Sequence, residues 1–180
     1  MKRATVFWFT NLVGPLILAS YWRGVGAVDD PLVYWGDVPP SMQSFIVPWM
    51  FVAAAGYLLM WQRFFFAWDE ETVASLHWPG QTADQRGVQR LFTVYAAFLL
   101  SSMIWIDLTR IYIEDPSTLV AIAIVAVLWT AGLASLAFGA LVWPARDRLP
   151  GAWIALAGCV MLSIQCTWWD AVYWVANFGW

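Results

Sequence analysis

Five long apolar stretches constrain this chain more than any other feature of its sequence. A helix needs about 20 apolar residues to cross the hydrocarbon core of a bilayer, and five segments meet or approach that length. They cover residues 5–22, 45–66, 90–112, 118–143 and 151–175. Most prolines fall in the polar connections between them, as expected of segments that break helices. The sequence therefore predicts an all-α integral membrane protein: a single domain, residues 1–180, built as a five-transmembrane-helix bundle with a long loop at 23–44.

The composition agrees with a chain that lies almost entirely in lipid. Hydrophobic residues make up 62% and charged residues 12%, whereas soluble domains usually carry about a quarter charged residues. A net charge of −3 without a basic patch argues against a nucleic-acid partner. The lipid bilayer is therefore the first expected partner.

The basic residues favour a cytoplasmic N-terminus. In that orientation seven of the nine basic residues lie inside, and only Arg23 and Arg110 lie outside. The inner set consists of Lys2, Arg3, Arg63, Arg86, Arg90, Arg146 and Arg148. The positive-inside rule then predicts that loop 23–44 and the C-terminus lie on the outer side.

The chain is poor in catalytic and metal-binding residues. His77 is the only histidine, and Cys159 and Cys166 are the only cysteines, so no cluster has metal-site spacing. The two cysteines are seven residues apart on one predicted helix, too far along it to form a disulfide with each other. No glycine-rich phosphate loop is present. We predict neither an enzyme nor a metal site.

Four ionisable residues lie at membrane depth in the predicted outer half. Asp107, Arg110 and Glu114 follow one another at helical spacing on the third span, and Asp170 lies among tryptophans on the fifth. Charges at this depth are costly and normally face the bundle interior or a wet cavity. Two interpretations are open: Arg110 pairs with Asp107 or Asp170 and ties helix ends together, or these groups form the polar rim of a pocket that opens outward, with loop 23–44 as its lid.

Eleven of the 15 tryptophans fall into two groups by depth. Those near span ends are typical of an interfacial belt: Trp22, Trp61, Trp68, Trp143 and Trp180. The deeper or clustered ones could pack the bundle or line a pocket for a flat aromatic ligand: Trp49, Trp105, Trp129, Trp168, Trp169 and Trp174. We expect Trp49, Trp105 and Trp174 to turn inward.

The start of the second span resembles the TspO/MBR family, the tryptophan-rich sensory or translocator proteins. That family has a Trp and a Pro-Pro pair before its second helix, then an aromatic run with a Trp, then a Gly. The matching residues here are Trp35, Pro39, Pro40, Phe45, Trp49 and Gly56. The second Trp is displaced by one position.

Two further segments carry the resemblance. Thr167–Asn177 is similar to the family's C-terminal signature Thr-x-Leu-Asn-x-x-x-Trp-x-x-Asn, with Asp170 in place of the first Asn. Ser102–Trp105 is similar to the Asn-x-x-Trp of the third helix. Leu162 stands where the family has another Trp, and the acidic residue usual in its fourth helix has no counterpart.

The resemblance implies a five-helix protein that binds flat hydrophobic ligands for sensing or transport. These are tetrapyrroles (porphyrins) and, in some members, sterol-like lipids. A bound tetrapyrrole would be the cofactor, with its propionates toward Arg110 or toward backbone donors near the outer rim. The residues expected at the ligand are Trp35, Pro39, Pro40, Trp49, Trp105, Arg110, Asp170, Trp174 and Asn177.

Two other functions stay open at the level of sequence. One is an accessory transmembrane subunit of a larger photosynthetic or respiratory complex, with the Trp and Phe surfaces as its interface. The other is a lipid-modifying enzyme using Asp107, Glu114 or Asp170, although no acidic diphosphate-binding motif supports it. The sequence leaves both a homodimer and a larger assembly open.

Overall fold

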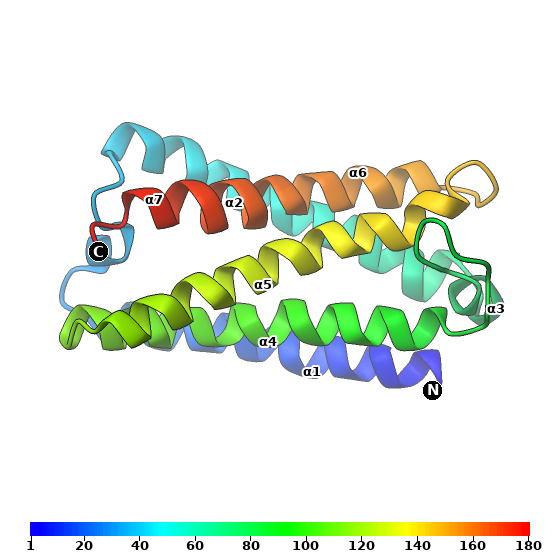
Figure 1. Ribbon diagram of the computed structural model, residues 1–180, viewed down its shortest axis with the longest axis horizontal. Helices are drawn as coiled ribbons and strands as arrows, with labels where there is room; N and C mark the ends of the chain where they lie inside the picture. Colours follow the sequence, from blue (N-terminus) through cyan, green and yellow to red (C-terminus); the bar gives the residue numbers. More distant parts are fainter.

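The computed structural model describes all residues, 1–180, and contains five long helices and no strand. The main helices are α1 Arg3–Gly26, α2 Pro40–Gln62, α4 Gly87–Glu114, α5 Thr118–Val142 and α6 Ala152–Ser163 (Figure 1). Two of them continue as π-helix: α2 through η2 (Arg63–Ala67), and α6 through η4 (Ile164–Trp174) into α7 (Val175–Asn177). Five helical units are long and apolar enough to cross a membrane. The predicted five-helix membrane fold is confirmed.

Short elements connect the long helices. The loop after α1 holds a 3₁₀ turn, η1 (Pro31–Trp35), the loop after η2 holds α3 (Glu70–Ala74), and a second 3₁₀ turn, η3 (Trp143–Ala145), follows α5. We refer to the end of the bundle with η1 and the C-terminus as the Trp180 end, and to the end with the N-terminus and α3 as the Met1 end (Figure 1).

Polar and proline residues decide where the helices begin. α5 begins at Thr118 because Ser117 caps it, its hydroxyl accepting from the Val120 N–H at 3.4 Å. α2 begins at Pro40, five residues before the predicted start, because proline suits the first turn of a helix, where its missing N–H costs nothing. The predicted spans followed apolar residues alone, so they matched the start of α5 and missed the start of α2.

The five helices form an open row rather than a closed ring. α1 packs on α4, α4 on α5, α5 on α6 and η4, and α6 on α2, whereas α1 and α2 barely touch. In Figure 1, α5 crosses diagonally between α4 and the α6–η4 helix. The two ends of the row, α1 and α2, therefore leave a space between them.

Two long helices, α2 and α6, approach each other closely where they cross. Gly56 and Gly158 face each other there, and a Cβ added at Gly56 would lie 2.6 Å from the carbonyl oxygen of Gly158. Small residues allow such close approach of helix backbones in membranes. The crossing fixes α6, and hence η4, against α2.

The Met1 end is the densely packed part of the molecule. Phe64, Tyr95 and Phe138 are fully buried, and the rings of Tyr95 and Phe138 pack edge to face with centroids 4.7 Å apart. The loop before α4 is held by Arg90, which binds Asp84 at 2.6 Å and the Leu76 carbonyl at 3.1 Å. The Arg90 guanidinium lowers the pKa of Asp84 to about 2. Free space in the bundle therefore lies toward the Trp180 end.

The orientation of the bundle gives a first prediction. With five crossings and a cytoplasmic N-terminus, a reporter fused after Trp180 is expected to lie on the outer side, because seven of nine basic residues then face inward. Paired fusions of a phosphatase, active only outside, and a fluorescent protein, bright only inside, measure this directly. Fluorescence without phosphatase activity would place the C-terminus in the cytoplasm and contradict the predicted orientation.

Candidate functional site

A cavity of about 770 Å³ lies inside the row of helices. It is lined by 32 residues, 23 of them hydrophobic, from α1, η1, α2, α4, α5, α6 and η4. Ligand pockets usually measure roughly 300–1,000 Å³ and have mainly apolar walls with a few polar groups. The cavity is therefore large enough for a drug-sized or lipid-sized molecule.

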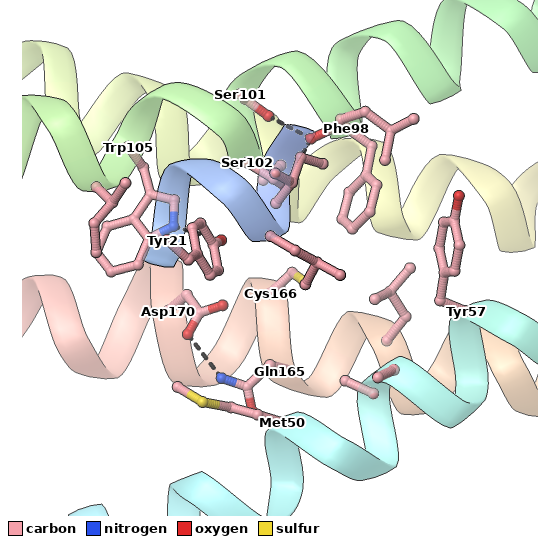
Figure 2. Close-up of a pocket in the computed structure, with 18 of the residues that line it drawn as sticks. Tyr21, Met50, Tyr57, Phe98, Ser101, Ser102, Trp105, Gln165, Cys166 and Asp170 are labelled. Atoms are coloured by element: carbon pink, nitrogen blue, oxygen red, sulfur yellow. Dashed lines mark hydrogen bonds between the residues drawn. The ribbon is translucent and has the colours of Figure 1, made fainter. Parts of the chain in front are cut away.

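Aromatic rings form the wall at the Trp180 end. The Trp105 and Trp174 rings pack edge to face at 5.8 Å, and Trp105 packs in the same way on Tyr21 at 5.8 Å. The indole N–H of Trp105 donates to the Tyr21 hydroxyl at 2.6 Å, which fixes both rings (Figure 2). Trp35 and Trp169 also line the cavity. This wall offers flat apolar faces to a ligand.

A π-helix brings the polar groups of the cavity together. Gln165 Nε2 donates to Asp170 Oδ1 at 2.8 Å, although the two residues are five apart (Figure 2). In an α-helix such a pair would not share a face, whereas π-helical turns join residues five apart. The π-helical form of η4 therefore places the amide beside the carboxylate.

Asp170 is the only Asp, Glu, Lys or Arg in the cavity wall. Its Oδ1 accepts from Gln165, and its Oδ2 has no protein partner and points away from Gln165 into the cavity (Figure 2). The side-chain amide oxygen of Gln165, Oε1, is buried and also has no hydrogen-bond partner. The polar part of the cavity thus presents two free acceptors, one of them on an acidic group without a counter-charge, and one unpaired donor, the indole N–H of Trp169.

The loop before α2 closes the cavity at the Trp180 end. Tyr34 donates its hydroxyl to the Gly24 carbonyl at 2.8 Å, and its own carbonyl accepts from the Trp174 indole N–H at 2.9 Å. The Asp37 N–H donates to the Asn177 carbonyl at 3.0 Å. Burial raises the pKa of Tyr34, so the phenol stays a hydrogen-bond donor. The loop is folded over the bundle, with Trp35 in the cavity wall, as expected of a lid.

A seam between α1 and α2 opens the cavity sideways. At the Met1 end the seam is closed, because Trp61 stacks on Phe7 at 5.7 Å and donates to Thr10 Oγ1 at 3.0 Å. Farther along, Leu18 and Leu58 line the cavity and yet are 71% and 59% exposed. Their exposure places the opening on the flank of the bundle, where lipid would lie.

The structure brings four of the nine predicted site residues to this cavity: Trp35, Trp105, Asp170 and Trp174. Trp49 does not line it. The wall position is taken by the next residue, Met50, because successive residues on a helix point in directions about 100° apart. The Trp49 indole nitrogen is instead buried without an acceptor. The expectation that Trp49 turns into the pocket was therefore wrong.

The other four predicted site residues lie outside the cavity wall, and each has a structural role. Pro39 and Pro40 are exposed and begin α2, and Asn177 holds the loop through its backbone carbonyl. Arg110 binds Glu114 at 2.6 Å and lies outside the cavity wall. Neither expected ion pair of Arg110 forms. Asp107 binds Arg23 and so ties α1 to α4, and Asp170 accepts from Gln165.

Three polar residues of the site were not predicted from the sequence: Tyr21, Tyr34 and Gln165. Gln165 could have been found, because it is the only amide side chain among the apolar residues before the C-terminal signature. Its place beside Asp170 depends on a π-helix, which the 3.6-residue periodicity of an α-helix does not reveal.

Comparison with known proteins identifies no relative. No protein-family model, no curated protein and no solved structure matches this chain. Arguments about function therefore start from the cavity, its lining and its openings.

Proposed function

We propose that this chain is a TspO-like membrane protein that binds a flat hydrophobic ligand inside its helix bundle, for sensing or transport. The cavity of about 770 Å³ carries this proposal. Its wall is mainly apolar, and the indoles of Trp105 and Trp174 supply the flat faces on which such a ligand stacks.

The convergence of the family-like motifs supports the same function. Trp35 comes from η1, Trp105 from α4, and Asp170 and Trp174 from η4, and all four residues line one cavity. These segments are far apart in sequence, and each carries part of the resemblance to the TspO/MBR family. Pro39, Pro40, Trp49 and Asn177 lie outside the cavity wall, so the support comes only from the four residues that line it.

The lining favours some of the implied ligands over others. A cation would balance the propionates of a porphyrin, but no Lys or Arg lines the cavity, and Arg110 is bound to Glu114 outside it. The Asp170 carboxylate would repel propionates. A sterol-like lipid, or a tetrapyrrole without free acid groups, fits the wall better.

The alternative of an accessory subunit in a larger complex predicts a loop that reaches a partner chain. Here the loop before α2 is bound to its own bundle through Tyr34 and Asp37. This arrangement favours a protein that works by itself. Purification as a stable free protein would support that conclusion, whereas consistent co-purification with a complex would favour the subunit.

Blocking the cavity tests the proposed function. Ser102 lines the cavity, and Ile104, two residues further on α4, does not and is 43% exposed. Mass spectrometry of gently purified protein is expected to find a retained hydrophobic molecule in the wild type and in Ile104→Trp. Ser102→Trp puts an indole into the cavity and is expected to lower retention about tenfold or more. Equal retention in both variants would place the molecule among surface lipids and contradict the proposal.

A further inference from the structure

The acidic group in the cavity has no counter-charge in the protein. The wall contains Asp170 and no Lys, Arg or His, and the ion pairs of this half of the bundle, Arg23–Asp107 and Arg110–Glu114, lie elsewhere. A carboxylate within a membrane span is costly unless it is paired. Something other than the protein must therefore balance it, or the group must be kept neutral.

The hydrogen bonds around Asp170 leave one oxygen free. Gln165 is 5% exposed and donates to Oδ1 at 2.8 Å, which holds the carboxyl group in one orientation. Oδ2 has no protein donor, and Figure 2 shows it pointing into the cavity. The nearby Tyr21 hydroxyl accepts from Trp105, and no hydrogen bond joins it to Asp170. The site therefore presents a fixed, open acceptor rather than a satisfied structural pair.

Aromatic rings surround this acceptor. Trp169 and Trp174 come from the same helical segment as Asp170, and Tyr21 and Trp105 face it across the cavity (Figure 2). The negative face of an aromatic ring attracts cations, most strongly for tryptophan and when water is excluded. A carboxylate among indoles is thus suited to a cationic group attached to an apolar body.

We propose that the cavity selects ligands that carry a protonated amine, with the ammonium group bound to Asp170 Oδ2 and the flat apolar body stacked against Trp105 and Trp174. Gln165 is a positioning residue, because it fixes Oδ1 and turns Oδ2 toward the ligand. The proposal rests on the proposed function, since it names the ligand class of the same cavity.

The test uses three pyrene probes that share one flat body: pyrenemethylamine, pyrenemethanol and methylpyrene. Binding is measured in phosphatidylcholine nanodiscs by energy transfer from the protein's tryptophans, with protein-free nanodiscs subtracted. Each probe is titrated against the wild type, Asp170→Asn and Gln165→Leu. The ratio of affinities between wild type and variant cancels the partition of each probe into lipid.

The wild type is expected to bind the amine at least about tenfold more tightly than Asp170→Asn does, because a charge-assisted bond and its counter-charge are lost together. Methylpyrene should bind both proteins alike. Gln165→Leu should weaken amine binding several-fold and leave the affinity for methylpyrene unchanged. A general packing defect would instead lower the affinity for both probes. Thermal unfolding checks that each variant is folded.

The outcomes separate this inference from the proposed function. If methylpyrene binds and the amine shows no preference for the wild type, the cavity binds hydrophobic ligands and the amine inference is wrong. If Asp170→Asn loses more affinity for pyrenemethanol than for pyrenemethylamine, the partner of Asp170 is a hydroxyl group and the inference is also overturned. If no probe binds above the nanodisc background, the proposed function fails as well.

Discussion

Gly158→Leu is expected to lower the free energy of unfolding by about 3 kcal/mol, the upper part of the range for overpacked cores. A Cβ at Gly158 would lie 3.2 Å from the Met60 backbone nitrogen and still closer to the Gly56 carbonyl oxygen. Both neighbours are backbone of α2, so they cannot turn aside as a side chain would. The whole of α2 must shift away from α6.

Gly14→Leu is the matched control for this change. A Cβ at Gly14 meets nothing within 4 Å, so the added side chain enters free space. Thermal unfolding of both variants, followed by circular dichroism in detergent, should show a clear loss only for Gly158→Leu. Equal melting temperatures would mean that the α2–α6 crossing does not limit stability.

Trp174→Ala is expected to destabilise the protein by about 3–5 kcal/mol, as large-to-small changes of buried aromatic residues do. Trp174 is 6% exposed, and its ring packs on Phe178 with centroids 4.3 Å apart. Its indole N–H also holds the Tyr34 carbonyl of the lid loop. The substitution therefore removes packing and loop anchoring together, and residues 27–39 should become sensitive to protease.

Two further variants separate these contributions. Trp174→Phe keeps most of the ring packing and loses the bond to Tyr34, so it should cost about 1 kcal/mol and still raise the rate of loop cleavage. Trp168→Ala lies in the same π-helical segment but is 54% exposed, so it should leave stability and cleavage close to wild type. A protected loop in Trp174→Ala would show that the loop is held by other contacts.

The number and position of the helices could be predicted because hydrophobicity over a span is a strong, local signal. Residue 118 was predicted as the start of the fourth span and begins α5, where Ser117 supplies a cap. The start of α2 was placed too late because apolar runs do not register the proline that begins the helix. Local composition therefore determined the spans, and single residues shifted their ends.

The site was less predictable because it depends on helix phase and on contacts between distant residues. Met50 rather than Trp49 lines the cavity, a difference of one residue that composition cannot resolve. Asp107 pairs with Arg23, 84 residues away, rather than with its neighbour Arg110. Gln165 meets Asp170 only because η4 is π-helical. Each of these depends on tertiary packing, which the sequence pattern does not contain.

The seam between α1 and α2 has a consequence for how affinity is measured. Its exposed residues Leu18 and Leu58 lie on the flank of the bundle that acyl chains would cover, while the lid loop and the Phe7–Trp61 stack close the two ends. A ligand would reach the cavity by diffusing within the bilayer, so its concentration per lipid, rather than per volume of buffer, sets occupancy. Dissociation constants expressed per volume should then rise in proportion to the amount of lipid added, while the mole fraction of ligand at half-saturation stays constant.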